Sequence, residues 1–170
     1  MNSDLLIEPL RTEHLEELAT QLRLPEVYQH IGELPSIKDF ILDREIALRG
    51  PDSSYAAHGE RWLDFLVRDR KTLHMLGRLE ASLHDSLAEV AFLFNPTHWG
   101  KGYASEALSW LHFHIEESYG VSSFWATTVP ANVRCQSLLR RAGYQQVHSD
   151  LPNLYSFDEG DIVFHFYLAP

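Results

Sequence analysis

Residues 88–117 change their hydrophobic period over a short distance, and this change constrains the fold more than any other feature of the chain. Residues 88–94 are apolar and aromatic and stop at Asn95-Pro96, which predicts a strand. A tight turn follows, Trp99-Gly100-Lys101-Gly102, and from Tyr103 the pattern becomes helical. The predicted apolar face of that helix comprises Ala104, Ala107, Leu108, Leu111 and Ile115, whereas its other faces carry Ser105, Ser109, His112 and Glu116.

A strand that leads through a Gly-x-Gly turn into a helix can bind an anion. The first N–H groups of a helix have no intrahelical acceptor, and glycine lets the backbone approach phosphate oxygens without an intervening Cβ. Lys101 would add a positive charge at the same place. The alternative is an ordinary turn that binds nothing, because so short a motif has low specificity.

Two familiar phosphate-binding loops do not fit these residues. The chain has no Gly-x-x-x-x-Gly-Lys-Ser/Thr, so a P-loop is excluded. A dinucleotide fingerprint tolerates Ser105 at its third small position, but it also needs an acidic residue about 20 positions further on. The next predicted strand, residues 124–129, contains no acidic residue. An oxidoreductase that binds NAD(P) is therefore disfavoured.

The segment Thr97-His98-Trp99-Gly100-Lys101-Gly102 resembles the acyl-coenzyme A loop of the GNAT N-acetyltransferase superfamily, Gln/Arg-x-x-Gly-x-Gly/Ala between a strand and a helix. Thr97 departs from that pattern. The continuation over residues 99–108 is similar to the RimJ/RimL-like branch of ribosomal-protein alanine acetyltransferases, in which this departure is common. A second block resembles the family's Asn-x-x-Ser and Leu-Leu-x-x-x-Gly-Phe; it reads Asn132-Val133-Arg134-Cys135, then Leu138-Leu139-Arg140-Arg141-Ala142-Gly143-Tyr144.

The resemblance implies one domain over residues 1–170, of the α/β (α+β) class, with a mixed, mostly antiparallel central sheet and helices on both faces. It also implies acetyl-coenzyme A as co-substrate and no metal. The family's sheet splays beside the central strand, whose backbone pairs with the pantetheine arm as with an added strand. The residues implied in cofactor binding are Phe92, Leu93, Phe94, His98, Trp99, Gly100, Lys101, Gly102, Tyr103, Ala104 and Asn132, the last with a helix cap as its alternative role.

Acetyl transfer to an amine needs a group that takes a proton from the ammonium and a group that protonates or stabilises the leaving thiolate. Glu89 stands on the central strand with Ala91 and Leu93 on a largely apolar face, so we expect a raised pKa and a role as general base. It also matches the strand glutamate that several family members use as base. The alternative is a solvated or salt-bridged glutamate. Glu80 and His84 on the neighbouring strand are weaker candidates.

The general acid is harder to assign. Many relatives have a tyrosine seven residues after the asparagine, and Leu139 occupies that position here. Cys135 stands where the branch usually has serine, and Ser137 follows two residues later. We expect Cys135 or Ser137 to lie near the sulfur of coenzyme A, with plain helix packing as the alternative for each.

The remaining elements follow from periodicity and turn residues. Further strands are expected at residues 5–10, 61–68, 73–83, 124–129, 145–148 and 161–168, with a bulge at Gly77. Helix caps are expected at Thr12, Ser36 and Asn132, and residues 50–59 are expected to form a mobile loop. The residues expected to face inward are Leu15, Leu18, Ala19 and Leu22 in the first helix and Ile37, Phe40, Ile41, Ile46 and Leu48 in the second.

Composition limits the partners and the compartment. The formal net charge of −10 argues against nucleic acid; it fits a cationic acceptor, and equally an acidic surface kept for solubility. Cys135 is the single cysteine, which excludes an intrachain disulfide and favours a reducing compartment. The first residues lack a secretory pattern and no run approaches a membrane span, so a cytoplasmic location is expected. The histidines show no spacing typical of a metal site.

The resemblance implies an acetyl-coenzyme A-dependent N-acetyltransferase, and from the family's usual mechanism we expect direct transfer of the acetyl group to a primary amine in a ternary complex. The acceptor is a protein N-terminus, a polyamine-like small molecule or an amine drug. The rival hypothesis is a coenzyme A-binding sensor or interaction module of the same fold without catalysis. Dimers are common in the family, so the resemblance is compatible with a homodimer as well as with a monomer.

Overall fold

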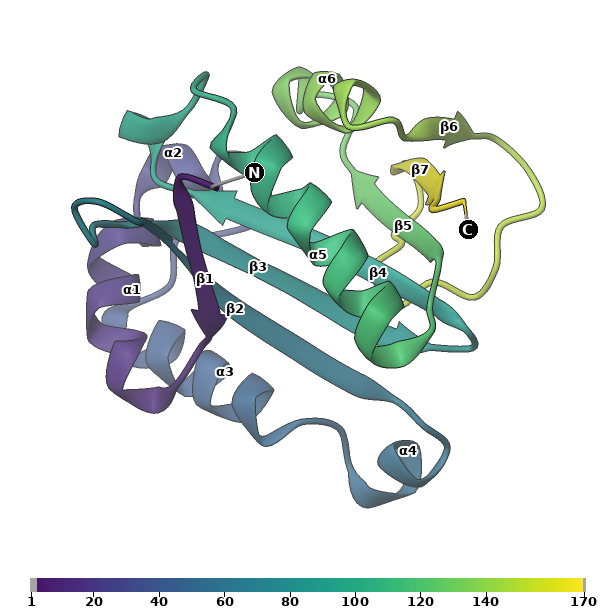
Figure 1. Cartoon of the computed structure of the whole chain (residues 1–170), viewed down its shortest axis with the longest axis horizontal. Helices are drawn as coiled ribbons and strands as arrows, with labels where there is room; N and C mark the ends of the chain where they lie inside the picture. The colour runs from purple at the N-terminus through teal and green to yellow at the C-terminus, as the bar shows by residue number, and fades with distance from the viewer. Residues whose placement is uncertain (1–2, 170) are drawn as a thin grey trace.

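The computed structural model describes residues 3–169 as a seven-stranded sheet with the order β1-β2-β3-β4-β5-β7-β6 (Figure 1). Neighbouring strands run antiparallel except β4 and β5, which are parallel. This confirms the predicted mixed, mostly antiparallel sheet. The strands are β1 Leu5–Pro9, β2 Arg61–Asp69, β3 Met75–His84, β4 Leu87–Phe94, β5 Ser123–Thr128, β6 Gln145–Val147 and β7 Ile162–Tyr167.

Helices cover both faces of this sheet. α5 packs on one face together with α6, over the larger apolar core that contains Leu108, Leu111 and Phe124. α1 and α3 pack on the opposite face, over a second core around Leu66 and Met75. The helices are α1 Leu15–Leu22, α2 Pro25–Tyr28, α3 Ile37–Arg49, α4 Ser53–Ala57, α5 Tyr103–Tyr119 and α6 Val133–Arg141, with short 3₁₀ turns η1 Thr12–His14 and η2 Pro96–His98.

Two helix caps were predicted correctly and one was not. The side chains of Ser36 and Asn132 accept the backbone N–H groups of Asp39 and Cys135, as N-caps do. Thr12 does not cap α1. It begins η1, and α1 starts only at Leu15.

α3 buries less of its surface than its sequence predicts. Phe40 is buried, but Ile37 and Ile46 are 56% and 48% exposed, so their predicted inward orientation is wrong. α3 contacts α1 and β2, and only a narrow stripe of its surface, formed by Phe40, Ile41 and Leu48, packs on the second core. The predicted loop over residues 50–59 is also wrong in part, because residues 53–57 form α4.

β3 carries the predicted irregularity at glycine. The register between β2 and β3 shifts after the pair Val67–Gly77, so Leu76 is the extra residue of a bulge. A Cβ at Gly77 would collide with the carbonyl oxygen of Leu93 and with Phe94. Glycine at this position therefore lets β3 approach the end of β4 closely.

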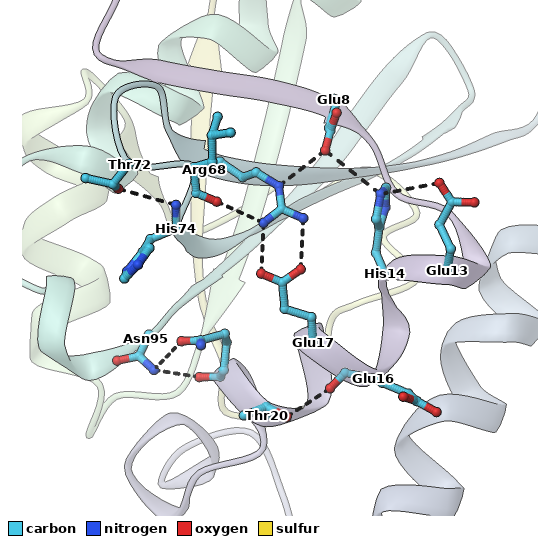
Figure 2. Close-up of polar contacts among 12 residues, drawn as sticks. Glu8, Glu13, His14, Glu16, Glu17, Thr20, Arg68, Thr72, His74 and Asn95 are labelled. Carbon is cyan, nitrogen blue, oxygen red and sulfur yellow. Dashed lines mark hydrogen bonds and ion pairs between the residues drawn. The ribbon is translucent and has the colours of Figure 1, made fainter.

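An ion pair fastens α1 to the sheet (Figure 2). The Arg68 guanidinium on β2 donates to both carboxylate oxygens of Glu17 on α1, at 2.8 and 2.9 Å, and also reaches Glu8 on β1 at 3.4 Å. The paired arrangement lowers the pKa of Glu17. Three elements at this edge are thereby held in one relative position.

His112 on α5 is buried, although its position in the helical pattern predicts another face. Its Nε2 lies 2.6 Å from the hydroxyl of Tyr144, and its ring stacks on Phe166. Burial lowers the pKa of His112 to about 4. A polar residue enters the core here because Tyr144 satisfies its nitrogen.

Among residues 3–169, no helix is long and apolar enough to cross a membrane.

Candidate active site

The parallel strands β4 and β5 separate soon after they meet. They pair at Ala88–Phe124 and Glu89–Trp125 and at no later rung of the part described, so they diverge toward the carboxyl end of β4 (Figure 1). The N–H of Asn95 donates to Leu76 on β3, and the alternation of strand hydrogen bonds then turns the N–H and C=O of Phe92 toward the gap. The expected splay beside the central strand is confirmed, and it leaves backbone groups without a partner strand.

A cavity of about 470 Å³ occupies this gap and the space around it. β4, η2 and the start of α5 form one wall, β5 and α6 another, and residues of α2 and the turn after it close it. The predicted site residues that line the cavity are Phe92, Leu93, Phe94, His98, Trp99, Gly100, Gly102, Tyr103, Ala104, Asn132 and Cys135. Three predicted site residues do not line it, namely Glu89, Lys101 and Ser137.

The turn before α5 has the geometry that its glycines predict. Gly100 and Gly102 have φ angles of +76° and +84°, a region that strongly favours glycine. The hydrogen bond from Glu106 N–H to the Gly102 carbonyl opens α5. The N–H groups of Tyr103 to Ser105 therefore precede any intrahelical acceptor and are available to an anion at this end of the cavity.

Asn95 holds this turn against α1, and the sequence did not single it out. Its side-chain oxygen accepts from the N–H and hydroxyl of Thr97. Its Nδ2 donates to the backbone and side-chain oxygens of Gln21, the two dashed lines drawn from Asn95 in Figure 2. The signal was present, since asparagine before proline commonly begins a turn. Its long-range partner Gln21 could come only from the fold.

Arg134 and Trp99 form the second support of the turn. The indole N–H of Trp99 donates to the Phe94 carbonyl at 2.9 Å, and the Arg134 guanidinium lies 3.2 Å from the ring centroid. This is a cation–π contact, and it places a permanent positive charge at the cavity wall. Arg134 and Arg141 both line the cavity, whereas the sequence singled out Lys101 as the cation.

Cys135 contributes a protonated thiol to the wall formed by α6. Burial raises the pKa of the Cys135 thiol, with Thr128 hydrogen-bonded to it. The thiol therefore keeps its proton at neutral pH. Cys135 lines the cavity, whereas Ser137, two residues further along α6, does not.

Glu89 is buried, but its pKa is not raised, so that expectation is wrong. Its Oε1 accepts from the N–H and hydroxyl of Ser156 at 2.9 and 2.6 Å. Its Oε2 accepts from the Tyr155 N–H at 2.8 Å and lies 2.5 Å from His84 Nε2. Burial alone would raise the pKa of Glu89, but these hydrogen bonds outweigh it and lower the pKa.

The other carboxylates on this face are also engaged. Arg78 Nη1 lies 2.6 Å from Glu80 Oε2 and 3.2 Å from Asp64 Oδ2, and Arg44 reaches both oxygens. Arg78 lowers the pKa of Glu80, while burial raises the pKa of Asp64. Glu80 is thus held ionised by two arginines, which makes it a poor proton acceptor.

The sequence analysis singled out no individual residue of α2 for the site. Glu26, His30 and Ile31 line the cavity from α2 and the turn that follows it. Pro25 at the first helical position was the only local signal, and it marks a helix start rather than a site.

No group of three or more histidine, cysteine, aspartate or glutamate side chains within residues 3–169 is arranged to hold a metal ion.

Comparison with known proteins agrees with this geometry. A structure of the acetyltransferase from Salmonella typhimurium that modifies the N-terminal serine of ribosomal protein L7/L12 aligns over 99% of this chain and 97% of its own, with a TM-score of 0.76 and 13% identity. A RimL L7/L12 α-N-protein acetyltransferase, in complex with coenzyme A in a disulfide with one of its cysteines, aligns over 98% and 96%, with a TM-score of 0.77 and 13% identity.

A chimera of spermidine N-acetyltransferase SpeG from Vibrio cholerae and hSSAT aligns over 97% of this chain and 96% of its own, with a TM-score of 0.73 and 14% identity. At such low identities, these structural alignments show a shared fold and no more. No curated protein matches the chain significantly by sequence. Residues 4–145 match the family described as the acetyltransferase (GNAT) domain. Since this match covers most of the chain, the protein belongs to the GNAT family of acetyltransferases.

Proposed function

We propose that the protein transfers the acetyl group of acetyl-coenzyme A to a primary amine by direct attack in a ternary complex. The observation that carries this proposal is the open gap between β4 and β5, which leads from the free N–H groups of α5 into the cavity. The amine is a protein N-terminus or a small-molecule amine, the two kinds of acceptor named for the structural neighbours.

The cofactor would lie along the gap. Its pyrophosphate would bind the N–H groups of Tyr103 to Ser105, with Arg134 as the nearby cation, and its pantetheine amides would pair with the backbone around Phe92. Asn132 also lines the cavity, although its side-chain oxygen is occupied as the cap of α6.

The transfer step needs one bond formed and one broken. The ammonium first loses a proton to water and becomes the free amine. The amine nitrogen then bonds to the thioester carbon, the carbon–sulfur bond breaks, and the thiolate takes the proton of the Cys135 thiol. The nitrogen releases its extra proton to water, and water restores the proton of Cys135. Cys135 suits this role because it lies in the cavity and burial raises the pKa of its thiol.

Glu89 would not be the direct base, because it does not line the cavity and its four hydrogen bonds keep it ionised. A cationic acceptor is supported by Glu26 at the cavity and by the net charge of −10. The single cysteine supports a reducing compartment, and we place the reaction in the cytoplasm.

The test is calorimetric titration with acetyl-coenzyme A, coenzyme A and NADH, followed by thiol release with spermidine and with a peptide that has a free N-terminal serine. We expect the two coenzyme A species to bind, NADH not to bind, and one amine class to release thiol. Binding without transfer to either amine would favour the non-catalytic coenzyme A-binding module. No binding of coenzyme A would contradict both.

A further inference from the structure

A chain of three hydroxyl and carboxylate groups crosses the point where β4 and β5 separate. Thr127 on β5 donates its hydroxyl to the Oγ and the carbonyl oxygen of Ser156, each at 3.1 Å. Ser156, in the loop between β6 and β7, donates its hydroxyl to Glu89 on β4 at 2.6 Å. Thr127 lines the cavity, and Glu89 is the last residue of β4 that pairs with β5.

The chemistry of these groups determines the direction of each hydrogen bond. An ionised carboxylate only accepts, and the lowered pKa of Glu89 keeps it ionised. The single hydroxyl proton of Ser156 is therefore directed to Glu89, so its Oγ can only accept from Thr127. The single proton of Thr127 is in turn directed to Ser156. Thr127 Oγ1 can therefore make a further hydrogen bond only as an acceptor, through its lone pairs.

We propose that Thr127 is the hydrogen-bond acceptor that orients the attacking amine, and that Ser156 and Glu89 are positioning residues that set its polarity. This assignment rests on the proposed function. An oxygen that only accepts binds an amine N–H and discriminates against a carbonyl oxygen at the same place. An N–H bonded to Thr127 would hold the amine with its lone pair free to attack the thioester carbon.

The position of Thr127 fits this role. It follows Trp125 and Ala126 at the start of the gap, where β5 has left β4 and the cavity begins. Cys135 lies on the wall formed by α6, and Thr128 beside Thr127 is hydrogen-bonded to the Cys135 thiol. Consecutive residues of β5 would thus serve the nucleophile and the leaving group from opposite faces of the strand.

Three variants test the assignment. Thr127→Val keeps the shape of the side chain and removes the oxygen, whereas Thr127→Ser keeps the oxygen. Ser123→Ala is the matched control, because it removes a hydroxyl on the same strand that bonds to His165 and Trp125 and does not line the cavity. Each is assayed for kcat/KM with the faster of spermidine and the N-terminal serine peptide, for acetyl-coenzyme A affinity, and for thermal unfolding.

We expect Thr127→Val to lower kcat/KM for the amine by about tenfold or more, equivalent to about 1.4 kcal/mol. Its affinity for acetyl-coenzyme A should stay at the wild-type value, which a general loss of structure would not allow. Thr127→Ser should retain activity within about threefold of wild type, since it keeps the acceptor oxygen. Ser123→Ala should leave kcat/KM unchanged.

Two results would overturn the assignment in distinguishable ways. If the wild type acetylates an amine and Thr127→Val does so equally well, the role of Thr127 is wrong and the proposed function stands. If the wild type binds acetyl-coenzyme A but transfers to neither amine, the proposed function is overturned, and the assignment with it.

Discussion

The carboxylate of Glu89 accepts the hydroxyl proton of Ser156 over 2.6 Å, although 67 positions separate the two residues along the chain. The same carboxylate also accepts the backbone N–H groups of Tyr155 and Ser156. Glu89 thus ties the loop between β6 and β7 to the central strand, next to the gap where we place the cofactor.

Glu89→Gln should loosen this loop. In glutamine an NH₂ group, which only donates, replaces one of the carboxylate oxygens that accept these hydrogen bonds. Two donors would then face each other, so we expect a loss of about 1–3 kcal/mol in the free energy of unfolding. Amide hydrogen exchange at Tyr155 and Ser156 should become faster. Glu117→Gln, at an exposed position of α5, is the control. Unchanged protection of both amides in Glu89→Gln would contradict the tie.

The wild-type protein should also lose this stabilisation in acid. The folded pKa of Glu89 lies below its ordinary value of 4.5, so its contribution is present above that value and disappears as the pH falls through the folded pKa. Glu89→Gln should lack this part of the acid dependence. The measurement is the free energy of unfolding in urea against pH for both proteins, and an equal decrease of the two curves in acid would contradict it.

Gly100→Glu should abolish coenzyme A binding while the fold is retained. The substitution puts a side chain and a negative charge where pyrophosphate is proposed to bind, and its φ of +76° adds a strain of about 1–2 kcal/mol. Gly50→Glu is the matched control, because Gly50 has a φ of +80° and lies outside the cavity. Calorimetry with coenzyme A separates them, and wild-type affinity in folded Gly100→Glu would show that the turn binds no phosphate.

Cys135→Ala should lower kcat by about a hundredfold, a typical contribution of a general acid, with coenzyme A affinity unchanged. The kcat of Cys135→Ser should lie between those of the wild type and Cys135→Ala, because a hydroxyl still carries a proton. Ser137→Ala should change kcat less than Cys135→Ala, since Ser137 does not line the cavity. Steady-state rates measured by thiol release check the order, and a fully active Cys135→Ala would assign the proton to another group.

His112 should make the fold less stable as the pH falls. Its pKa is about 4 in the folded protein and 6.5 ordinarily, so unfolding takes up a proton in this range. The contribution of neutral His112 is complete above about pH 6.5 and decreases by about 3 kcal/mol toward pH 4. NMR titration of its imidazole measures the folded pKa directly, and a midpoint near 6.5 would contradict this account.

The sequence alone determined the strand, turn and helix over residues 88–117 and the family to which they belong. These features depend on local physics, since hydrophobic period selects strand or helix and positive φ angles favour Gly100 and Gly102. The caps at Ser36 and Asn132 were equally predictable, because each cap bonds to a residue three positions away.

Only the tertiary structure decided the ionisation of the site. A carboxylate on an apolar strand face predicts a raised pKa, but the donors that lower the pKa of Glu89 include Tyr155 and Ser156, which the chain brings back from far along the sequence. His112 entered the core because of Tyr144, 32 positions away. The hydrophobic pattern around a residue predicts its place within its own helix or strand. Its pKa and burial depend instead on the residues that the fold packs against it from elsewhere in the chain.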